Sequence, residues 1–428
     1  MRTFFVIWLG QFASLLGSEM TSFAVTIWAW EITQQATPLS LILVVSQVPR
    51  LLISPFAGVW VDTFSRKRLM LLGDSVAGVS TILLLALLLS NNLQIWHLYA
   101  FGALGGLFGY IHQLAYSASL SLIVAEKHYT RASALESLQM SGSYVLAPAA
   151  AGALYAFAGL SGVLCFDLVT FGCAIASLSL VSIPSPSKTA DTPLTAESAA
   201  PAFLEKITFG LRYLKSRPSL TIFLGFLLIS SFIDSASFAI LPAMVLARSN
   251  NDSTVWGTLL AFFGTGGLIG GSLLGIWGGP KRQIHGVLLG SAFWKVGLIV
   301  LALAQRTTVK VGAALGSGIC SPFPVSCSQT IWRKQVDPAL QGRVFSTRYL
   351  LTQIATPVGA AIAGPLADQV FEPAMQPDAW LAQWLGGVFG TGLGAGMAMQ
   401  LALFSFCGMA IALGGYSIHQ LREIESRS

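Results

Sequence analysis

The sequence predicts an all-α membrane protein in which twelve transmembrane helices form two pseudo-symmetric six-helix bundles. Of its 428 residues, 54% are hydrophobic and only 10% are charged, whereas soluble domains carry about 25% charged residues. Twelve mostly apolar stretches fill nearly the whole chain, and a bilayer core about 30 Å thick needs about 20 helical residues to cross it. Because that core holds no water, backbone groups must be satisfied within each segment, so the stretches are helices.

The positions of these stretches give the order of the spans. The first is a retained span, because its apolar run continues to about Trp30, beyond the roughly 7 to 15 residues of a signal-peptide core. An even number of spans leaves both termini on one side of the membrane. The predicted spans are residues 3–30, 38–61, 69–91, 95–124, 132–157, 160–183, 219–247, 255–279, 285–304, 308–332, 343–371 and 386–419.

Lysine and arginine set the orientation, because positive loops stay in the cytoplasm. With both termini inside, the other face keeps only Arg248, Arg306 and Lys310. This predicts a multi-pass protein of the cell (inner) membrane, and it explains the net charge of +6 through topology and membrane lipids, with no nucleic-acid partner. The cytoplasmic set is Arg2, Arg66, Lys67, Arg68, Lys127, Arg131, Lys188, Lys206, Arg212, Lys215, Arg217, Lys281, Arg282, Arg333, Lys334, Arg343, Arg348, Arg422 and Arg427.

The longest polar gap divides the spans six and six. We predict a first bundle over residues 1–183, a cytoplasmic connector over 184–218 and a second bundle over 219–428. The connector begins with a Ser/Thr/Pro/Ala-rich linker. Its second part predicts an interfacial helix near lipid phosphates, with one apolar face made by Phe203, Ile207, Leu211 and Leu214.

A short internal repeat supports two related halves. Gly58-Val-Trp60 followed by Leu71-Leu72-Gly73 returns as Gly275-Ile-Trp277 followed by Leu288-Leu289-Gly290, with basic residues between the two parts in both copies. Parallel six-helix repeats are one plan for transporters, whose substrate site lies between the halves near the midplane. The repeat therefore favours a transporter over a channel, which would more often carry repeated pore loops.

The loop after the second span reads Gly58-Val-Trp-Val-Asp62-Thr-Phe-Ser-Arg66-Lys67-Arg68. A small residue at Gly58 allows helices to approach closely, and Asp62 can face a helix N-terminus or a cation. The spacing resembles the loop 2–3 signature of the major facilitator superfamily, with a serine in place of the usual glycine before Arg66.

In that family this loop latches the two halves when the cytoplasmic side is closed. The resemblance therefore implies a cytoplasmic gate that includes Gly58, Asp62, Arg66 and Arg68. Arg343, at the start of the eleventh span, is the expected partner in the other half.

Further motifs narrow the resemblance. Ala147-Pro148-Ala-Ala-Ala-Gly152 resembles the Gly-Pro-x-x-Gly-Gly motif of proton-coupled antiporters, with alanine at two glycine positions. Pro148 would bend the helix, and the small neighbours would allow tight packing. Residues 341–346 and 363–373 are similar to the drug:proton antiporter branch that contains macrolide efflux proteins and the enterobactin exporter, and the similarity covers essentially the whole chain. The predicted fourth span lacks the arginine that the family often uses in proton transfer.

Coupling must then rest on other buried charges, since a lone charge in a membrane costs about 3 kcal/mol or more and marks function by default. The predicted proton or cation sites are Glu19, near the middle of its span, and Asp234, in the corresponding span of the other half. Arg50 could pair with Glu19 or receive an anionic substrate. Lys295 lines the cavity or pairs with an acid.

Three more polar residues lie in predicted spans. Asp167 is a further candidate for proton or substrate binding, but for Asp74 and Asp167, near helix ends, helix-end or interhelical hydrogen bonding is the favoured interpretation. His112 could relay protons because its reference pKa is near 6.5, although a buried histidine is more often a satisfied packing residue.

The hypothesis is a secondary active transporter that exports a small amphipathic molecule (a drug, siderophore or peptide-like natural product) by proton antiport and alternating access. The chain lacks the Gly-x-x-x-x-Gly-Lys-Ser/Thr loop that binds ATP phosphates. A lipid or lysolipid transporter of the same superfamily is the alternative, followed by a non-transporting receptor or scaffold. We expect a monomer with no cofactor, no metal and no enzyme activity, because the loops lack catalytic spacings and the five cysteines lie in apolar runs without ligand spacing.

Overall fold

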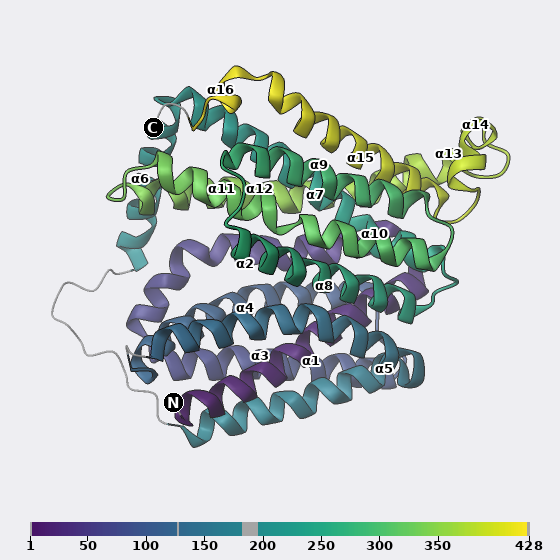
Figure 1. Cartoon of the computed structure of the whole chain (residues 1–428). Helices are drawn as coiled ribbons and strands as arrows, with labels where there is room; N and C mark the ends of the chain where they lie inside the picture. Colours follow the sequence, from purple (N-terminus) through teal and green to yellow (C-terminus); the bar gives the residue numbers. More distant parts are fainter. Residues whose placement is uncertain (1, 126–127, 182–195, 426–428) are drawn as a thin grey trace. The chain divides into compact units, whose positions relative to one another are not determined.

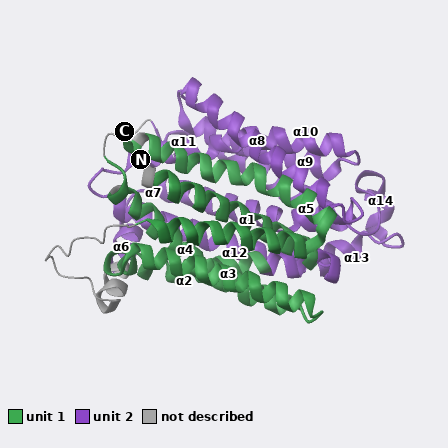
Figure 2. Cartoon of the chain, turned by 90° about the horizontal axis from the view of Figure 1, so that it is seen from below, with its two compact units in different colours: residues 1–29, 42–203 green, residues 30–41, 204–428 purple. Residues whose placement is uncertain are grey.

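The computed structural model describes residues 2–125, 128–181 and 196–425, and this part of the chain is helical without strands (Figure 1). Contacts divide it into two compact units, coloured in Figure 2: unit 1 holds residues 1–29 and 42–203, and unit 2 holds 30–41 and 204–428. The longer helices are α1 (Arg2–Thr33), α2 (Ala36–Thr63), α3 (Arg66–Leu89), α4 (Ile95–Ile123), α5 (Tyr129–Leu180), α6 (Ala196–Lys215), α7 (Pro218–Ala247), α8 (Ser253–Trp277), α9 (Gln283–Leu303), α10 (Thr307–Cys320), α11 (Pro322–Gln335), α12 (Gln341–Leu366), α14 (Trp380–Phe389) and α15 (Ala395–Gly414).

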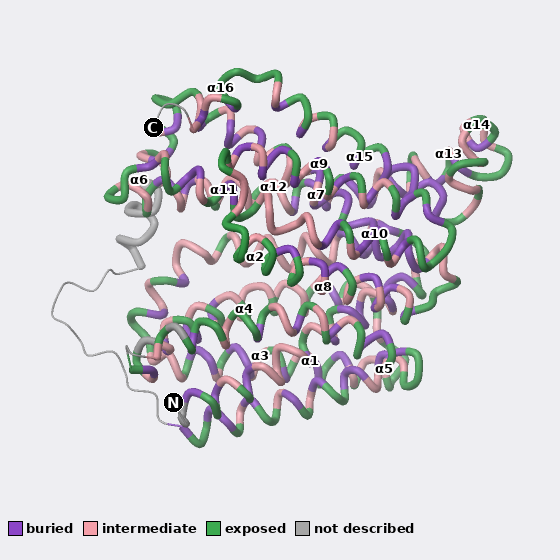
Figure 3. Tube along the Cα trace, in the orientation of Figure 1, coloured by how far each residue is buried: buried purple, intermediate pink, exposed green. Residues whose placement is uncertain are grey.

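Every predicted span falls on one or two of these helices, so the predicted all-α membrane fold is confirmed. Eight helices in the described residues are long and apolar enough to cross a membrane by themselves. Large apolar side chains are exposed along the helices, as at Phe157, Leu180 and Ile276, and buried and exposed positions alternate along the long helices in Figure 3. This outward apolar surface fits a protein surrounded by lipid, because water-soluble proteins rarely expose apolar patches of such size.

Helix α5 contains two predicted spans, and the chain reverses at Gly159. This residue has φ 61° and ψ −162°, a backbone conformation that only glycine adopts without strain. The first arm runs parallel to α1, since Trp8 donates to the carbonyl of Leu135 at 2.9 Å and Phe12 lies beside Gly142. The second arm runs antiparallel to α1, because Gly10 packs on Ser177 while Gly17, further along α1, packs on Thr170.

Two predicted spans differ from the observed helices. Residues 308–332 are not one helix: α10 ends at Cys320 and α11 begins at Pro322, a residue with no N–H to continue the ladder. The start predicted at 386 for the last span is wrong. Residues 380–389 form the separate helix α14, and α15 begins only at Ala395, after glycines at 390, 392 and 394 with φ near +80° end one helix and begin the next.

Unit 1 packs α1 to α5 around a core that includes Met70 of α3, Ile111 and Ala115 of α4 and Leu178 of α5. Unit 2 has its own core, in which Phe223 of α7 lies 6.0 Å from Trp332 of α11 between ring centroids. Close backbone approach joins the helices of each unit at glycines, as in other membrane helix pairs.

The repeated glycines occupy equivalent places. A Cβ on Gly73 would lie 2.7 Å from His112 on α4, and one on Gly290 would lie 2.8 Å from Phe323 and Pro324 on α11. Both glycines thus allow the third helix of a half to approach the fourth, which is what a structural repeat requires.

The predicted connector is described only in its second part. Its linker residues 184–195, which include Lys188, lie outside the described residues, as do Lys127 and Arg427. The side chains of Arg2, Phe203 and Lys206 are also not described. The predicted helix is present as α6, but the described residues of its predicted apolar face are not all buried. Leu214 is buried in the core of unit 2 and Gly210 packs against Thr347 of α12, whereas Leu211 is exposed.

Residues 30–41, at the turn between α1 and α2, pack within unit 2. Trp30 is fully buried, and its indole N–H donates to Asn251 Oδ1 at 2.8 Å. The carboxylate of Asp368, in the π-helical turn η2 (Ala367–Phe371), accepts the backbone N–H groups of Ala36 and Thr37 at 2.8 Å each. Asp368 therefore caps the N-terminus of α2 from another helix.

Replacing Asp368 by alanine is expected to destabilise the protein by about 1–2 kcal/mol, because two backbone donors of α2 lose a charged acceptor at the positive end of the helix. Thermal unfolding of the purified protein in detergent would measure the change. Asp378→Ala is the matched control, since Asp378 is exposed. An equal loss in both variants would contradict a capping role.

Candidate functional site

Unit 2 contains a cavity of about 460 Å³ that combines hydroxyl, apolar and charged groups. The lining comes from α7, α9, α11 and α12, with one residue from the α10–α11 junction. Its residues are Phe226, Leu227, Ser230, Ser231, Asp234, Ser291, Trp294, Ser321, Pro324, Val325, Ser328, Arg348, Thr352, Gln353 and Thr356. A pocket with mixed lining of this size suits a small amphipathic molecule.

One predicted site residue, Asp234, lines this cavity. A second, Lys295, does not line it but contacts Asp234. The Lys295 ammonium forms an ion pair with Asp234 Oδ1, which also accepts the Trp294 indole N–H at 3.0 Å. Lys295 is 2% exposed, whereas the Asp234 side chain is 44% exposed. The aliphatic chain of Lys295 packs on Gly408 of α15. The predicted pairing of Lys295 with an acid is therefore the arrangement that forms, and only its partner faces the cavity.

Aromatic rings and a close helix contact hold this pair in place. Trp294 lies 5.8 Å from Phe263 and 6.4 Å from Phe238 between ring centroids. On the other side of Asp234, Ser235 donates to the carbonyl of Thr356 at 2.6 Å, so α7 and α12 meet beside the ion pair.

Arg348 was missed as a site residue by sequence reasoning, which counted it among the cytoplasmic positive charges. It lies within α12 and lines the cavity, and its guanidinium carbon is 5.2 Å from the centroid of the Trp332 ring. Its position about two turns inside the helix was the available signal.

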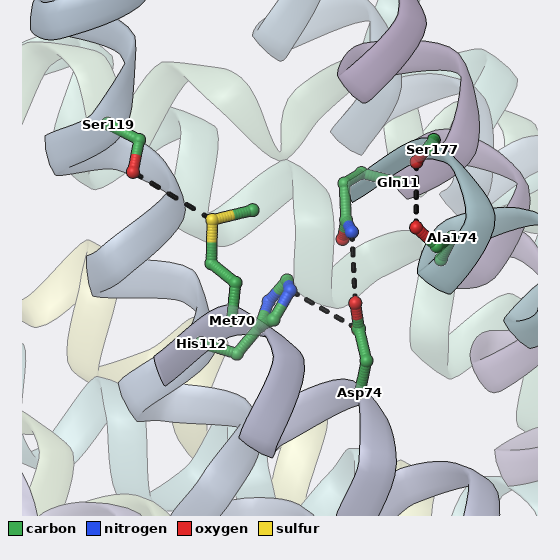
Figure 4. A network of polar contacts seen from close by, with 7 residues as sticks. All are labelled: Gln11, Met70, Asp74, His112, Ser119, Ala174 and Ser177. Carbon is green, nitrogen blue, oxygen red and sulfur yellow. Dashed lines mark hydrogen bonds and ion pairs between the residues drawn. The ribbon is translucent and has the colours of Figure 1, made fainter. Parts of the chain in front are cut away.

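Unit 1 brings together two other predicted residues, Asp74 and His112, from α3 and α4 (Figure 4). His112 Nε2 lies 3.3 Å from Asp74 Oδ1, within ion-pair range but without hydrogen-bond alignment. Gln11 of α1 donates to Asp74 Oδ2 at 3.1 Å. The cluster links three helices, which supports interhelical hydrogen bonding as the role of Asp74. His112 also packs against Gly73, the neighbour of Asp74 on α3.

Asp167 is buried in unit 1 and accepts two hydroxyl donors. Thr21 Oγ1 donates to Asp167 Oδ2 at 3.0 Å, and Thr81 Oγ1 donates to the same oxygen at 2.9 Å. These bonds join α1, α3 and the second arm of α5. Asp167 therefore acts as an interhelical acceptor, consistent with the favoured sequence interpretation.

Of the two roles considered for Arg50, pairing with Glu19 is not seen among the described residues. Glu19 makes no hydrogen bond or ion pair with another residue in the described part of the chain. Arg50 donates to Gln113 Oε1 at 3.1 Å and lies over the Tyr110 ring at 5.2 Å. Both contacts of Arg50 lie on α4, and they occupy its guanidinium without the acid on α1.

The contacts of the predicted gate residues Arg66 and Arg343 each lie within one unit. Arg66 donates to the Ala118 carbonyl at 2.6 Å, near the end of α4 within unit 1, and Asp62 and Arg68 are exposed. Arg343 lies over the Phe209 ring at 5.2 Å in unit 2. Among the described residues of unit 1, no atom lies within 4 Å of a Cβ built on Gly58, so no helix of this unit approaches it closely.

The antiporter-like motif lies in the first arm of α5. The helix continues through Pro148, and Gly152 is buried four residues later. One side of the motif therefore packs inside unit 1, whereas Ala149 and Ala150 are exposed.

Comparison with known proteins identifies the family. A model of the Major Facilitator Superfamily matches residues 7–360. The chain belongs to the major facilitator superfamily. It is 24% identical to macrolide efflux protein A of Streptococcus pyogenes over 369 residues, which cover 86% of this chain and 90% of that protein. It is 23% identical to macrolide efflux protein A of Enterococcus faecalis over 314 residues, 73% of this chain and 95% of that protein.

Solved structures support the major facilitator fold. A bacterial homologue of the iron transporter ferroportin in an inward-facing state aligns over 96% of this chain and 99% of that chain, with 16% identity and a TM-score of 0.63. The nucleoside transporter NupG aligns over the same shares, with 12% identity and a TM-score of 0.65. At these identities the likeness concerns the fold alone. The predicted family is confirmed, and this chain is a multi-pass membrane transporter of a superfamily of transporters, not of enzymes.

Proposed function

We propose that this major facilitator transporter exports a small amphipathic molecule across the cell (inner) membrane, in exchange for protons and by alternating access. Both termini would lie in the cytoplasm. The observation that carries the proposal is the Asp234–Lys295 pair beside a cavity whose lining mixes hydroxyl and apolar groups. A half-exposed carboxylate bound to a buried ammonium can exchange a proton with the cavity, and the family relatives named as macrolide efflux proteins support export.

In this mechanism Asp234 alternates between the ion pair and a protonated form. When Asp234 binds a proton, Lys295 loses its partner, so the two protonation states favour different arrangements of α7 and α9. Glu19, which lacks an ion-pair partner among the described residues, is the second proton candidate. Asp62 and Arg66, with Arg68 and Arg343, stay proposed as the cytoplasmic gate.

Uptake into inside-out vesicles from a pump-deficient bacterial strain tests this function. Erythromycin, a cationic dye and a siderophore are each supplied with and without a pH gradient. We expect gradient-dependent accumulation of at least one compound, and its loss in Glu19→Gln or in the double variant Asp234→Asn/Lys295→Met. Accumulation that persists in both variants would refute these proton sites. Flipping of a labelled lysolipid without uptake of any compound would instead favour the lipid-transporter alternative.

A further inference from the structure

Arg348 is a cation without a counter-ion inside the unit 2 cavity. Its guanidinium lies over the ring of Trp332, a residue that is completely buried. No acidic side chain among the described residues forms an ion pair with Arg348. A stacked guanidinium keeps its N–H edges free for a ligand, and those edges match the geometry of a carboxylate or phosphate.

The acid in this cavity does not neutralise Arg348. Asp234 is already paired with Lys295, so these two charges cancel. The Asp234 end of the cavity lies beside Thr356, which is eight residues beyond Arg348 on α12. At 1.5 Å per residue the two ends are about 12 Å apart along the helix. The cavity therefore keeps one net positive charge, at its Arg348 end.

An unpartnered hydroxyl lines the same cavity. Ser328 of α11 is 3% exposed, and its Oγ has no hydrogen-bond partner in the described part of the protein. Ser328 lies four residues, about one helical turn, before Trp332, on which Arg348 stacks. A buried hydroxyl without a partner is unfavourable unless a ligand completes it.

We propose that this cavity binds amphipathic molecules through an acidic group, which Arg348 and Ser328 hold while the apolar part contacts Phe226, Leu227 and Val325. The proposal rests on the proposed function, because it names the chemical class of the exported molecule. A lone cation inside a membrane is costly, and an acidic ligand removes that cost. A free carboxylate compound and an anionic lipid headgroup share this chemistry.

Binding of cholate to the purified full-length protein tests the proposal. Cholate carries one carboxylate and three hydroxyls on an apolar body, and its methyl ester is the matched neutral probe. Radiolabelled probe is bound to protein in phosphatidylcholine nanodiscs, and empty nanodiscs give the background. We expect cholate to bind about tenfold more tightly than the ester, and Arg348→Gln to remove that preference.

Two variants separate a local effect from misfolding. Arg348→Lys keeps the charge and is expected to retain part of the preference, and Ser328→Ala is expected to weaken cholate more than its ester. Equal binding of acid and ester by the wild type, or a preference that survives Arg348→Gln, overturns the proposal. Competition by phosphatidylglycerol supports the site and assigns it to a lipid headgroup; no competition assigns it to a free acid.

The result of the binding experiment does not depend on the result of the transport experiment. Acid binding that depends on Arg348, without gradient-driven uptake in vesicles, leaves the site valid and refutes proton-driven export. Uptake of erythromycin with no acid preference does the reverse.

Discussion

Replacing Asp234 by asparagine is expected to destabilise the protein by about 3–5 kcal/mol, since it leaves the Lys295 ammonium buried without its partner. Replacing Lys295 by methionine is expected to cost much less. The Asp234 side chain is 44% exposed and can be hydrated by the cavity, whereas Lys295 is 2% exposed. The two halves of one ion pair thus make unequal contributions when removed singly.

Unfolding of each variant in mixed micelles, followed by tryptophan fluorescence, measures these changes. The double variant Asp234→Asn/Lys295→Met is expected to recover most of the loss caused by Asp234→Asn, because no buried charge remains unpaired. If the losses of the two single variants simply add in the double variant, the two residues do not act as a pair.

Sequence reasoning found both members of this pair because ionisable residues are rare in apolar spans. A charge at Asp234 or Lys295 stands out against its neighbours, and its membrane cost predicts a partner. The partner's identity depends on how α7 and α9 pack, which spacing along one chain does not give. The same limit left the partner of Arg50 open: the sequence allowed Glu19 or a substrate, and in the structure Arg50 contacts Gln113 and Tyr110 on α4.

Arg348 and Asp368 show a second limit. Arg348 lies close in sequence to Arg333, Lys334 and Arg343, so the positive-inside rule accounted for it without a site. Asp368 caps α2 from more than 300 residues away in sequence, and no local pattern marks such a cap. Periodicity and hydropathy predict helices well, but they do not report which end of one helix a distant carboxylate meets.

The predicted start of the last span was wrong for a local reason. Residues 386–419 are almost uniformly apolar, and hydropathy alone joins them. The glycines at 390, 392 and 394 adopt positive φ and end α14, so a closer weighting of glycine would have divided the segment.

Replacing Gly270 of α8 by alanine is expected to destabilise unit 2 by about 3 kcal/mol, through overpacking against a rigid backbone. A Cβ at this position would overlap the carbonyl oxygen of Ile319 in α10. That atom belongs to the backbone and cannot rotate away, so the two helices would have to separate. Gly266, one turn earlier, makes the same kind of contact with Leu315.

The neighbouring Gly271 provides the matched control for this substitution. A Cβ on Gly271 would meet no atom within 4 Å, so Gly271→Ala should be neutral or stabilise the helix by up to about 1 kcal/mol, through its higher helix propensity. Unit 1 offers the same pair in α4, where Gly106 packs on the Ser46 carbonyl and Gly105 has open space. Thermal unfolding of the four variants should therefore separate Gly106→Ala and Gly270→Ala from the other two. An equal change in stability in all four variants would show that the close approach of backbones at Gly106 and Gly270 does not explain the need for glycine there.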